Sequence, residues 1–128
     1  MIKLFDPVIG KEEEIAIRNT LYSKFWASGA GTGNVSKFEA AFKDYTKTKS
    51  CVTVNNGTSA LHLALSLIDI KGKEVILPSL SFVSTAHAVM YNGGIPVFVD
   101  VDSSGCLDAT QIEDAITHKT KAILPVHF

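Results

Sequence analysis

The second half of the chain alternates short apolar runs with segments of helical length. The apolar runs lie at 51–54, 74–77, 95–99 and 121–126. They are rich in β-branched residues and nearly continuous, which is typical of strands covered on both faces. Helix-length segments lie between them, at 58–69, 82–92 and 108–117. The order βαβαβαβ predicts an α/β fold, with a mostly parallel sheet and helices on both of its faces.

The first half of the chain has helical periodicity instead. Residues 11–26 predict an amphipathic helix, with Ile15, Tyr22 and Phe25 on one side. A second helical stripe follows at spacings of three, four and three residues, formed by Val35, Phe38, Phe42 and Tyr45. We therefore expect two N-terminal helices within residues 1–50, followed by the sheet region at 51–128.

Glycines and caps indicate where several of these elements end. Gly93-Gly94 is a helix stop, and Asp108 with Gln111 three residues later resembles a capping box. The run Gly29-x-Gly31-x-Gly33 departs from a dinucleotide fingerprint, because Asn34 replaces the third glycine and a helix precedes it. We interpret this run as a connector between the first two helices.

The junction after the first predicted strand is the main candidate binding site. The strand 51–54 passes into a helix through Asn56-Gly57-Thr58-Ser59. A helix start leaves backbone N–H groups unpaired, and such a terminus attracts an anion such as phosphate. Gly57 allows a close approach, and Thr58 and Ser59 add hydroxyl donors. A plain helix N-cap is the alternative, and these residues alone leave both interpretations open.

A second candidate, Phe82, follows the strand predicted at 74–77 and is expected to open the next helix. Ligands of parallel sheets bind beyond the carboxyl ends of the strands, where this ring could stack on a flat ligand. The alternative is that Phe82 is a core residue. A phosphorylated planar cofactor would use both Phe82 and the turn Asn56-Gly57-Thr58-Ser59, which is called the phosphate turn below.

Other polar residues give weaker signals. Asp100 and Asp102 are explained by a turn before Ser103-Ser104-Gly105. His62 is interpreted as a solvated or partner-facing side chain. His127 follows a strand on the expected ligand side, and its role stays open. No residue is assigned to catalysis or to a metal.

Composition narrows the class of protein. The 12 basic and 13 acidic residues are nearly balanced, so nothing indicates a nucleic-acid partner. The apolar runs are too short to span a bilayer, and the acidic run Glu12-Glu13-Glu14 is unlike a secretory signal. Cys51 and Cys106 lack metal-ligand spacing, and we expect two free thiols in a reducing cytoplasm.

Taken together, these landmarks resemble the pyridoxal-phosphate (PLP) aminotransferases of fold type I. The match is closest to the DegT/DnrJ group, which aminates keto sugars attached to nucleotides. The matching segments are Ser28-Gly29, Phe38-Glu39-x-x-Phe42, Asn56-Gly57-Thr58-Ser59-Ala60-Leu61, Pro78-x-x-Ser81-Phe82-Val83-Ser84-Thr85, Gly94-x-Pro96-Val97-Phe98-Val99-Asp100-Val101-Asp102 and Ile116-Thr117-x-Lys119-Thr120-Lys121-Ala122-Ile123-x-Pro125-Val126-His127. The resemblance depends on their order and spacing, and it extends from about the first helix to Phe128.

The resemblance implies PLP as cofactor and a nucleotide sugar as substrate. The amides of Thr58 and Ser59, with the Thr58 hydroxyl, would hold the cofactor phosphate beside Gly57, and Phe82 would stack on the pyridine ring. In this family the active site is completed across a homodimer interface, so a homo-oligomer in the cytoplasm is implied.

The resemblance also implies two residues that have no counterpart in this sequence. These are an aspartate that pairs with the pyridine nitrogen and a lysine that forms the Schiff base. The lysines beside strands, such as Lys73 and Lys119, precede the strands and so lie at the opposite end of the sheet. We therefore expect residues 1–128 to be a single partial domain, the N-terminal portion of an aminotransferase, which does not transaminate alone. An open edge at 121–126 is expected to favour oligomerisation.

Two alternatives stay open at this point. One is a non-catalytic module of the same ancestry, which binds a phosphorylated ligand or docks on another protein. The other is a different fold type I enzyme, such as a desulfurase or a decarboxylating lyase. The lack of a histidine at position 82 argues against many of these enzymes.

Overall fold

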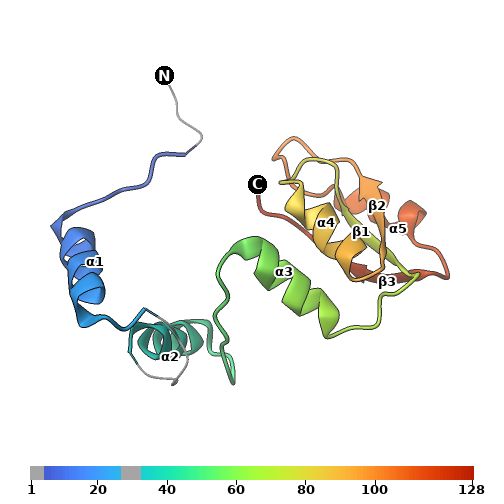
Figure 1. Ribbon diagram of the computed structural model, residues 1–128. Coiled ribbons are helices and arrows are strands. Elements are labelled where there is room, and N and C mark those ends of the chain that lie inside the picture. Colours follow the sequence, from blue (N-terminus) through green and yellow to red (C-terminus); the bar gives the residue numbers. More distant parts are fainter. Residues whose placement is uncertain (1–4, 27–32) are drawn as a thin grey trace. The chain divides into compact units, whose positions relative to one another are not determined.

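The computed structural model of the chain describes residues 5–26 and 33–128. The chain divides into two compact units, Met1–Thr53 and Val54–Phe128, which are described one at a time (Figure 1). The glycine-rich connector predicted at 28–34 lies largely outside the described residues, as does the Ser28-Gly29 match.

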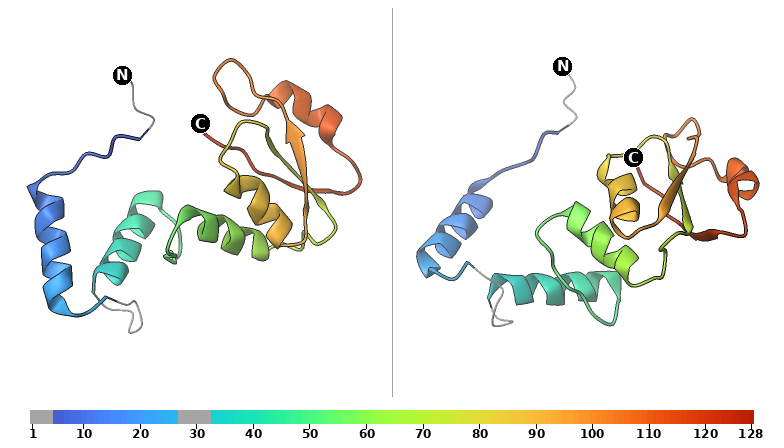
Figure 2. Two further views of the ribbon diagram at one scale, coloured as in Figure 1. Left: turned by 45° about the horizontal axis from the view of Figure 1, so that its top comes forward. Right: turned by 45° about the vertical axis from the view of Figure 1, so that its right-hand side comes forward.

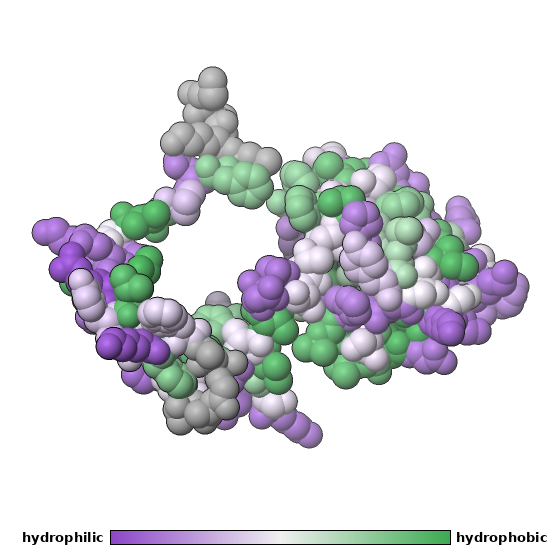
Figure 3. Space-filling model, in the orientation of Figure 1, coloured by the Kyte–Doolittle hydropathy of each residue, from purple (hydrophilic) through white to green (hydrophobic). Residues whose placement is uncertain are grey.

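The Met1–Thr53 unit contains helices α1 (Lys11–Ser23) and α2 (Asn34–Thr46). The N–H of Gly10 donates to Glu13 Oε2 at 2.7 Å, and three glutamates in the first turn suit the positive end of α1. The rings of Phe38 and Phe42 lie 5.7 Å apart on α2. Neither helix has a buried residue among those described. Figure 3 shows apolar side chains gathered along one side of α1, away from its polar side.

The Val54–Phe128 unit is built on a three-stranded parallel sheet. Its strands are β1 (Glu74–Pro78), β2 (Ile95–Val99) and β3 (Thr120–Ile123), in the order β2-β1-β3. The central strand is almost wholly buried, whereas the two outer strands are partly exposed. The predicted cover on both faces therefore holds best for β1, which has a neighbour on each side.

Helices cover both faces of this sheet. The helical elements are α3 (Gly57–Ser66), α4 (Ser84–Tyr91), a short 3₁₀ turn (Ala109–Gln111) and α5 (Ile112–Ala115). Figures 1 and 2 show α4 on one face and α5 on the other, as right-handed crossovers in opposite directions require. The predicted α/β class, with a parallel sheet between helices, is confirmed.

One core holds this unit together. Its buried apolar side chains come from α3, α4, β1 and the loop before β1, and they are Leu65, Ile70, Val75, Leu77, Ala88 and Val89. The predicted stop at Gly93-Gly94 seals one end of it. Gly93 has a φ of +74°, and a Cβ on Gly94 would lie 2.9 Å from Val89 Cγ1. Glycine at 94 is therefore required by close packing.

The prediction of a strand at 51–54 was wrong. Residues 51–54 form no strand, and the sheet has three strands rather than four. The physical reason lies in the backbone donors. The N–H of Thr53 donates to the Glu39 carboxylate at 2.8 Å, so it is not available for a strand ladder. The apolar character of 51–54 indicated a strand, but no described segment pairs with it.

Other element boundaries differ from the prediction. The helix expected at 108–117 is a 3₁₀ turn followed by the one-turn α5. Asp108 does cap it, because its carboxylate accepts the N–H of Thr110 at 2.9 Å. The Gln111 side chain bonds to the Asp108 carboxylate rather than to the Asp108 backbone N–H, which bonds to Asp100 O, so the capping box is incomplete. The strand expected at 121–126 ends at Ile123, although the N–H of Leu124 still donates to Ile76 O at 2.8 Å.

Candidate functional site

The start of α3 combines a side-chain cap with free backbone donors. Asn56 is the N-cap, and its Oδ1 accepts the N–H of Ser59 at 2.8 Å. The N–H groups of Gly57 and Thr58 make no hydrogen bond with any described residue. The N-cap interpretation and the anion interpretation are thus both partly realised. Two donors remain at the positive end of the helix, where an anion is stabilised.

This arrangement changes the prediction for Ser59. Its amide was expected to face the phosphate, but in this structure Asn56 occupies it. Ser59 also does not line the cavity described below. The physical cause is the usual preference of asparagine for the N-cap, where its carbonyl oxygen satisfies an otherwise unpaired donor.

Gly57 is not explained by backbone conformation or by packing. Its φ lies outside the left-handed region that favours glycine. A Cβ placed on it would meet no atom within 4 Å among the described residues. A Cβ could therefore be accommodated at this position in the folded chain. What glycine provides is open space at the helix start, which is what a ligand needs for close approach to the amides.

Phe82 lies in the turn between β1 and α4. It was predicted to open the helix, but α4 begins two residues later, at Ser84. Its carbonyl oxygen accepts the N–H of Thr85 at 3.0 Å, which fixes the turn. The side chain is 72% exposed, so the alternative of a core phenylalanine is excluded in this structure.

Gly57, Thr58 and Phe82 line the same open cavity, which has a volume of about 640 Å³. Its other walls come from α3 and α4, through Ala60, Leu61, Ala64, Ser84 and Thr85. A volume of this size is within the usual range of about 300–1,000 Å³ for small-molecule sites. The structure therefore brings the phosphate turn and the aromatic ring to one place, as one phosphorylated planar ligand would need.

Ser84 and Thr85 are cavity residues to which the sequence analysis gave no function. Both are nearly buried, with 8% and 4% exposure. The only sequence signal was their position directly after Phe82, within a matching family segment. Two neighbouring hydroxyl residues at a predicted helix start are too common to be selected on that basis.

The carboxyl ends of β1 and β2 meet as predicted. The N–H of Ser79 donates to Val99 O at 2.8 Å, and its hydroxyl lies 3.3 Å from Asp100 Oδ1. Asp102 forms the predicted turn, since it accepts both the N–H and the hydroxyl of Ser104, and these bonds lower its carboxyl pKa. No group of three or more metal-ligating side chains occurs in residues 5–26 and 33–128.

The histidines lie outside the cavity. His62, on α3, is exposed, as expected, and its ring centroid lies 6.1 Å from that of Tyr91. His87, on α4, lies 5.7 Å from the same tyrosine. His127 is exposed and does not line the cavity. The position of His127 therefore gives it no part in this site.

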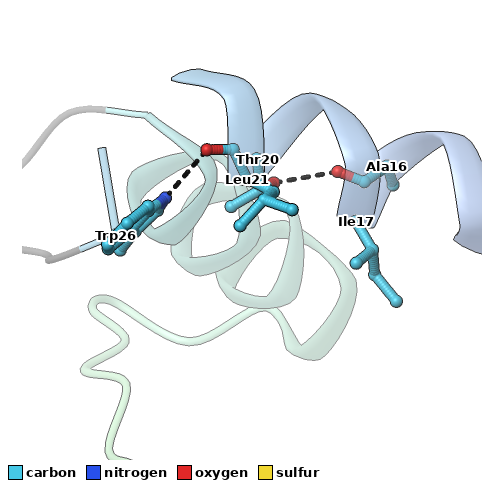
Figure 4. A pocket seen from close by; sticks show the side chains of 5 residues that line it. All are labelled: Ala16, Ile17, Thr20, Leu21 and Trp26. Atoms are coloured by element: carbon cyan, nitrogen blue, oxygen red, sulfur yellow. Dashed lines mark hydrogen bonds between the residues drawn. The ribbon is translucent and has the colours of Figure 1, made fainter. Parts of the chain in front are cut away.

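A separate hollow lies on the Met1–Thr53 unit, beside α1. Figure 4 shows its lining residues, which are Ala16, Ile17, Thr20, Leu21 and Trp26. The indole N–H of Trp26 donates to Leu21 O at 3.2 Å, and the Thr20 hydroxyl donates to Ala16 O at 2.9 Å. All five lining residues are uncharged, and the two polar groups are already paired. This hollow thus offers packing surface but no chemistry for catalysis.

The comparison with protein families matches this combination of fold and site. The family model of the DegT/DnrJ/EryC1/StrS aminotransferases matches residues 7–128. The chain belongs to this family. The resemblance inferred from the motifs is thereby confirmed, and the match includes the phosphate turn, Phe82 and both crossovers of the sheet.

Two similar proteins are named for the synthesis of a GDP-linked sugar and of a spore coat polysaccharide. The chain is 49% identical over 104 residues to GDP-perosamine synthase of Caulobacter vibrioides, which covers 80% of this chain and 28% of that protein. It is 41% identical to the spore coat polysaccharide biosynthesis protein SpsC of Bacillus subtilis, over 95% of this chain and 31% of that protein. The chain spans about a third of the length of the curated relatives that it matches.

Solved structures share the fold. The PMP form of a sugar aminotransferase from Streptococcus pneumoniae superposes with a TM-score of 0.81 at 31% identity, over 97% of this chain and 31% of that one. An Escherichia coli GDP-4-keto-6-deoxy-D-mannose-3-dehydratase with bound hydrated PLP gives a TM-score of 0.82 at 28% identity, over 95% of this chain and 33% of that one. These neighbours are PLP enzymes of fold type I, and PLP is the cofactor of the family.

The described residues contain no helix that is both long enough and apolar enough to span a bilayer.

Proposed function

We propose that the Val54–Phe128 unit provides the phosphate- and ring-binding part of a PLP-dependent aminotransferase that acts on nucleotide-linked keto sugars. One observation carries this proposal: Gly57, Thr58 and Phe82 line a single cavity. The aminotransferase family of the chain supports it, as do relatives named for the synthesis of GDP-linked and coat sugars.

The residues of the cavity fit this cofactor. Two unpaired N–H groups at a helix start suit a phosphate, and the open space at Gly57 admits it. An exposed aromatic side chain on the same cavity suits a flat ring. When bound, the pyridine ring of PLP acts as the electron sink for moving an amino group.

Each binding residue then has a distinct part. Gly57 and Thr58 donate backbone N–H groups to the phosphate, and the Thr58 hydroxyl adds a third donor. Phe82 packs against the ring and keeps water from that face. The Ser59 N–H can bond to the phosphate only if it no longer bonds to Asn56 Oδ1, so we assign Ser59 a smaller part in phosphate binding than Thr58. Together these contacts orient the cofactor without taking part in proton transfer.

We also propose that residues 1–128 do not transaminate alone. No lysine lines the cavity. Lys73 and Lys119 lie at the amino ends of the strands, where the Lys73 carbonyl oxygen accepts the N–H of Ile95 and the Lys119 carbonyl oxygen accepts the N–H of Glu74. Borohydride treatment in the presence of PLP should therefore fix no pyridoxyl group at one defined lysine, as measured by peptide mass spectrometry. A single stoichiometric adduct would contradict this proposal.

Titration calorimetry tests the binding site directly. We expect the chain to bind PLP more tightly than pyridoxal, which lacks the phosphate. Phe82→Ala should weaken PLP binding about five- to tenfold, because the loss of a stacking contact of about 1 to 1.4 kcal/mol lowers affinity by that factor. Phe98→Ala is the matched control, since Phe98 is also exposed but lies on β2 outside the cavity. Equal binding of PLP and pyridoxal would refute the phosphate site.

For the whole enzyme we propose a homodimer in the cytoplasm. The apolar side chains of α1 and α2 that stay exposed, such as Ile17 and Phe38, suit burial against a second subunit. Both cysteines are free, which is usual in a reducing compartment. Light scattering of the enzyme at rising concentration measures this directly, and a monomer at all concentrations would exclude the dimer.

A further inference from the structure

The cavity has two nearly buried hydroxyl side chains in its wall. Ser84 and Thr85 are the buried polar residues of the described chain, and both line the cavity from the first turn of α4. Neither hydroxyl makes a hydrogen bond with a described residue. The N-cap of α4 is Val83, and no side chain caps this helix. The two hydroxyls therefore do not serve the helix that carries them.

An unpaired hydroxyl in a nearly buried position is unfavourable unless it meets water or a ligand. Among the described residues, each side-chain nitrogen or oxygen that is fully shielded from solvent has a hydrogen-bond partner. The oxygens of Ser84 and Thr85 must therefore reach the molecular surface. The surface that both residues share is the cavity wall, so both hydroxyls are available to whatever the cavity binds.

Two helix starts meet at this cavity. Gly57 and Thr58 are the first residues of α3, and Ser84 and Thr85 are the first residues of α4. These two helices pack against each other. Each start has the positive end of a helix dipole, and anions are stabilised there. The cavity therefore has positive helix ends and hydroxyl donors on two of its sides.

We propose that Ser84 and Thr85 donate hydrogen bonds to the phosphoryl group of the ligand, which is thus held between the starts of α3 and α4. This inference rests on the proposed phosphate site and adds two binding residues from a second helix. It also explains why hydroxyl residues occupy a nearly buried position that their own helix does not use. A packing role for both side chains is the competing explanation.

Two hydroxyl deletions separate these explanations. Thr85→Val and Ser84→Ala keep most of the side-chain volume and remove the donor. Each should weaken binding of PLP and of inorganic phosphate about tenfold in titration calorimetry, the effect of one hydrogen bond to a charged group. The unfolding temperature of the ligand-free chain should stay unchanged or rise, because an unpaired buried hydroxyl is removed.

Matched variants sharpen the test. Thr85→Ser keeps the hydroxyl and should therefore bind PLP and phosphate as the wild type does, unlike Thr85→Val. Ser66→Ala, at the other end of α3, removes an exposed hydroxyl that donates to Leu63 O and should leave binding unchanged. Pyridoxal binding should not change in any variant, because it has no phosphoryl oxygen.

Three outcomes of these measurements would count against the inference, and they differ in what they mean for the proposed function. If the wild type prefers PLP to pyridoxal but Thr85→Val and Ser84→Ala bind both phosphate compounds normally, the inference is overturned and the proposed function stands. If both variants lower the unfolding temperature and weaken the binding of pyridoxal as much as the binding of PLP, the two residues only pack, and the inference is overturned. If the wild type binds neither PLP nor phosphate, the inference and the proposed function both fail.

Discussion

The two units of the chain are stabilised in different ways. The Val54–Phe128 unit has a buried core around β1, whereas the helices of the Met1–Thr53 unit bury no described side chain. Many described bonds of the first unit are local, such as Arg18 to Glu14 at 2.7 Å and Gly10 to Glu13, although Thr53 also bonds to Glu39 on α2. Local bonds of this kind contribute a few tenths of a kcal/mol each, about ten times less than a buried leucine.

The binding site follows this division. All residues that line the cavity come from the unit with the core, so their positions are set by packing that does not depend on ligand. The sequence instead gives α1 and α2 apolar stripes whose large side chains stay exposed in the structure. A stripe without cover stabilises little, because most helix stability in proteins comes from packing of the apolar face.

The largest expected effect is a cavity in the sheet core. Leu77→Ala removes a fully buried side chain and should lower the free energy of unfolding of the Val54–Phe128 unit by about 2–5 kcal/mol. Leu21→Ala, on α1, is the matched change at 58% exposure and should cost less than about 1 kcal/mol. Urea unfolding of both variants measures the difference. Similar costs in the two variants would show that the two units are stabilised alike.

A smaller effect comes from glycine at a packed position. Gly94→Ala places a Cβ 2.9 Å from Val89 Cγ1 and 3.1 Å from Ile70 Cδ1, and overpacking of this kind costs about 1–3 kcal/mol. Gly57→Ala meets no atom and should leave stability unchanged or raise it by up to about 1 kcal/mol. The same variant should weaken PLP binding, since its methyl group occupies the space left for the ligand. Thermal unfolding and calorimetry on both variants test this, and a destabilised Gly57→Ala would refute the open-space argument.

Removal of the N-cap of α3 should have a smaller effect on stability. Asn56→Ala removes the acceptor of the Ser59 N–H and should lower the free energy of unfolding by about 1 kcal/mol. Asn56→Asp keeps the acceptor and should restore stability. Chemical denaturation monitored by circular dichroism compares the two. α1 and α2 have glycine at the N-cap, so no equivalent loss exists in the first unit.

The smallest effect is a pH dependence within the first unit. The Glu39 carboxylate accepts the hydroxyl and the N–H of Thr53, and both bonds lower its pKa from the ordinary value of 4.5. Because the folded pKa is depressed, this link is fully formed above pH 4.5 and is lost as pH falls through the lower folded value. The amide resonance of Thr53 should shift across that range. In Glu39→Gln it should not titrate, and a titration that persists would assign it to another group.

Much of the fold was predictable because its signals are local. The apolar runs at 74–77 and 95–99 indicated β1 and β2 almost to the residue, and Gly93-Gly94 indicated the end of α4. The run at 51–54 was equally apolar but formed no strand. A strand needs a partner as well as a suitable composition, and pairing between distant segments is not encoded in a short window.

The site shows the same limit. Gly57, Thr58 and Phe82 could be proposed from the residue types that follow each strand, and the structure brings them to one cavity. Ser59 could not be separated from Thr58, because only the geometry shows that Asn56 bonds to its amide. Ser84 and Thr85 could not be selected at all, since their burial and their lack of partners exist only in the folded chain.

The order β2-β1-β3 also bears on how the chain is synthesised. The middle strand leaves the ribosome before both of its neighbours. Each later strand therefore meets a pairing surface that already exists, and no strand has to be inserted between two others. The ligand cavity, which is lined by α3, by Phe82 in the turn after β1 and by α4, is encoded entirely before β2, so its walls have been translated before the sheet is complete.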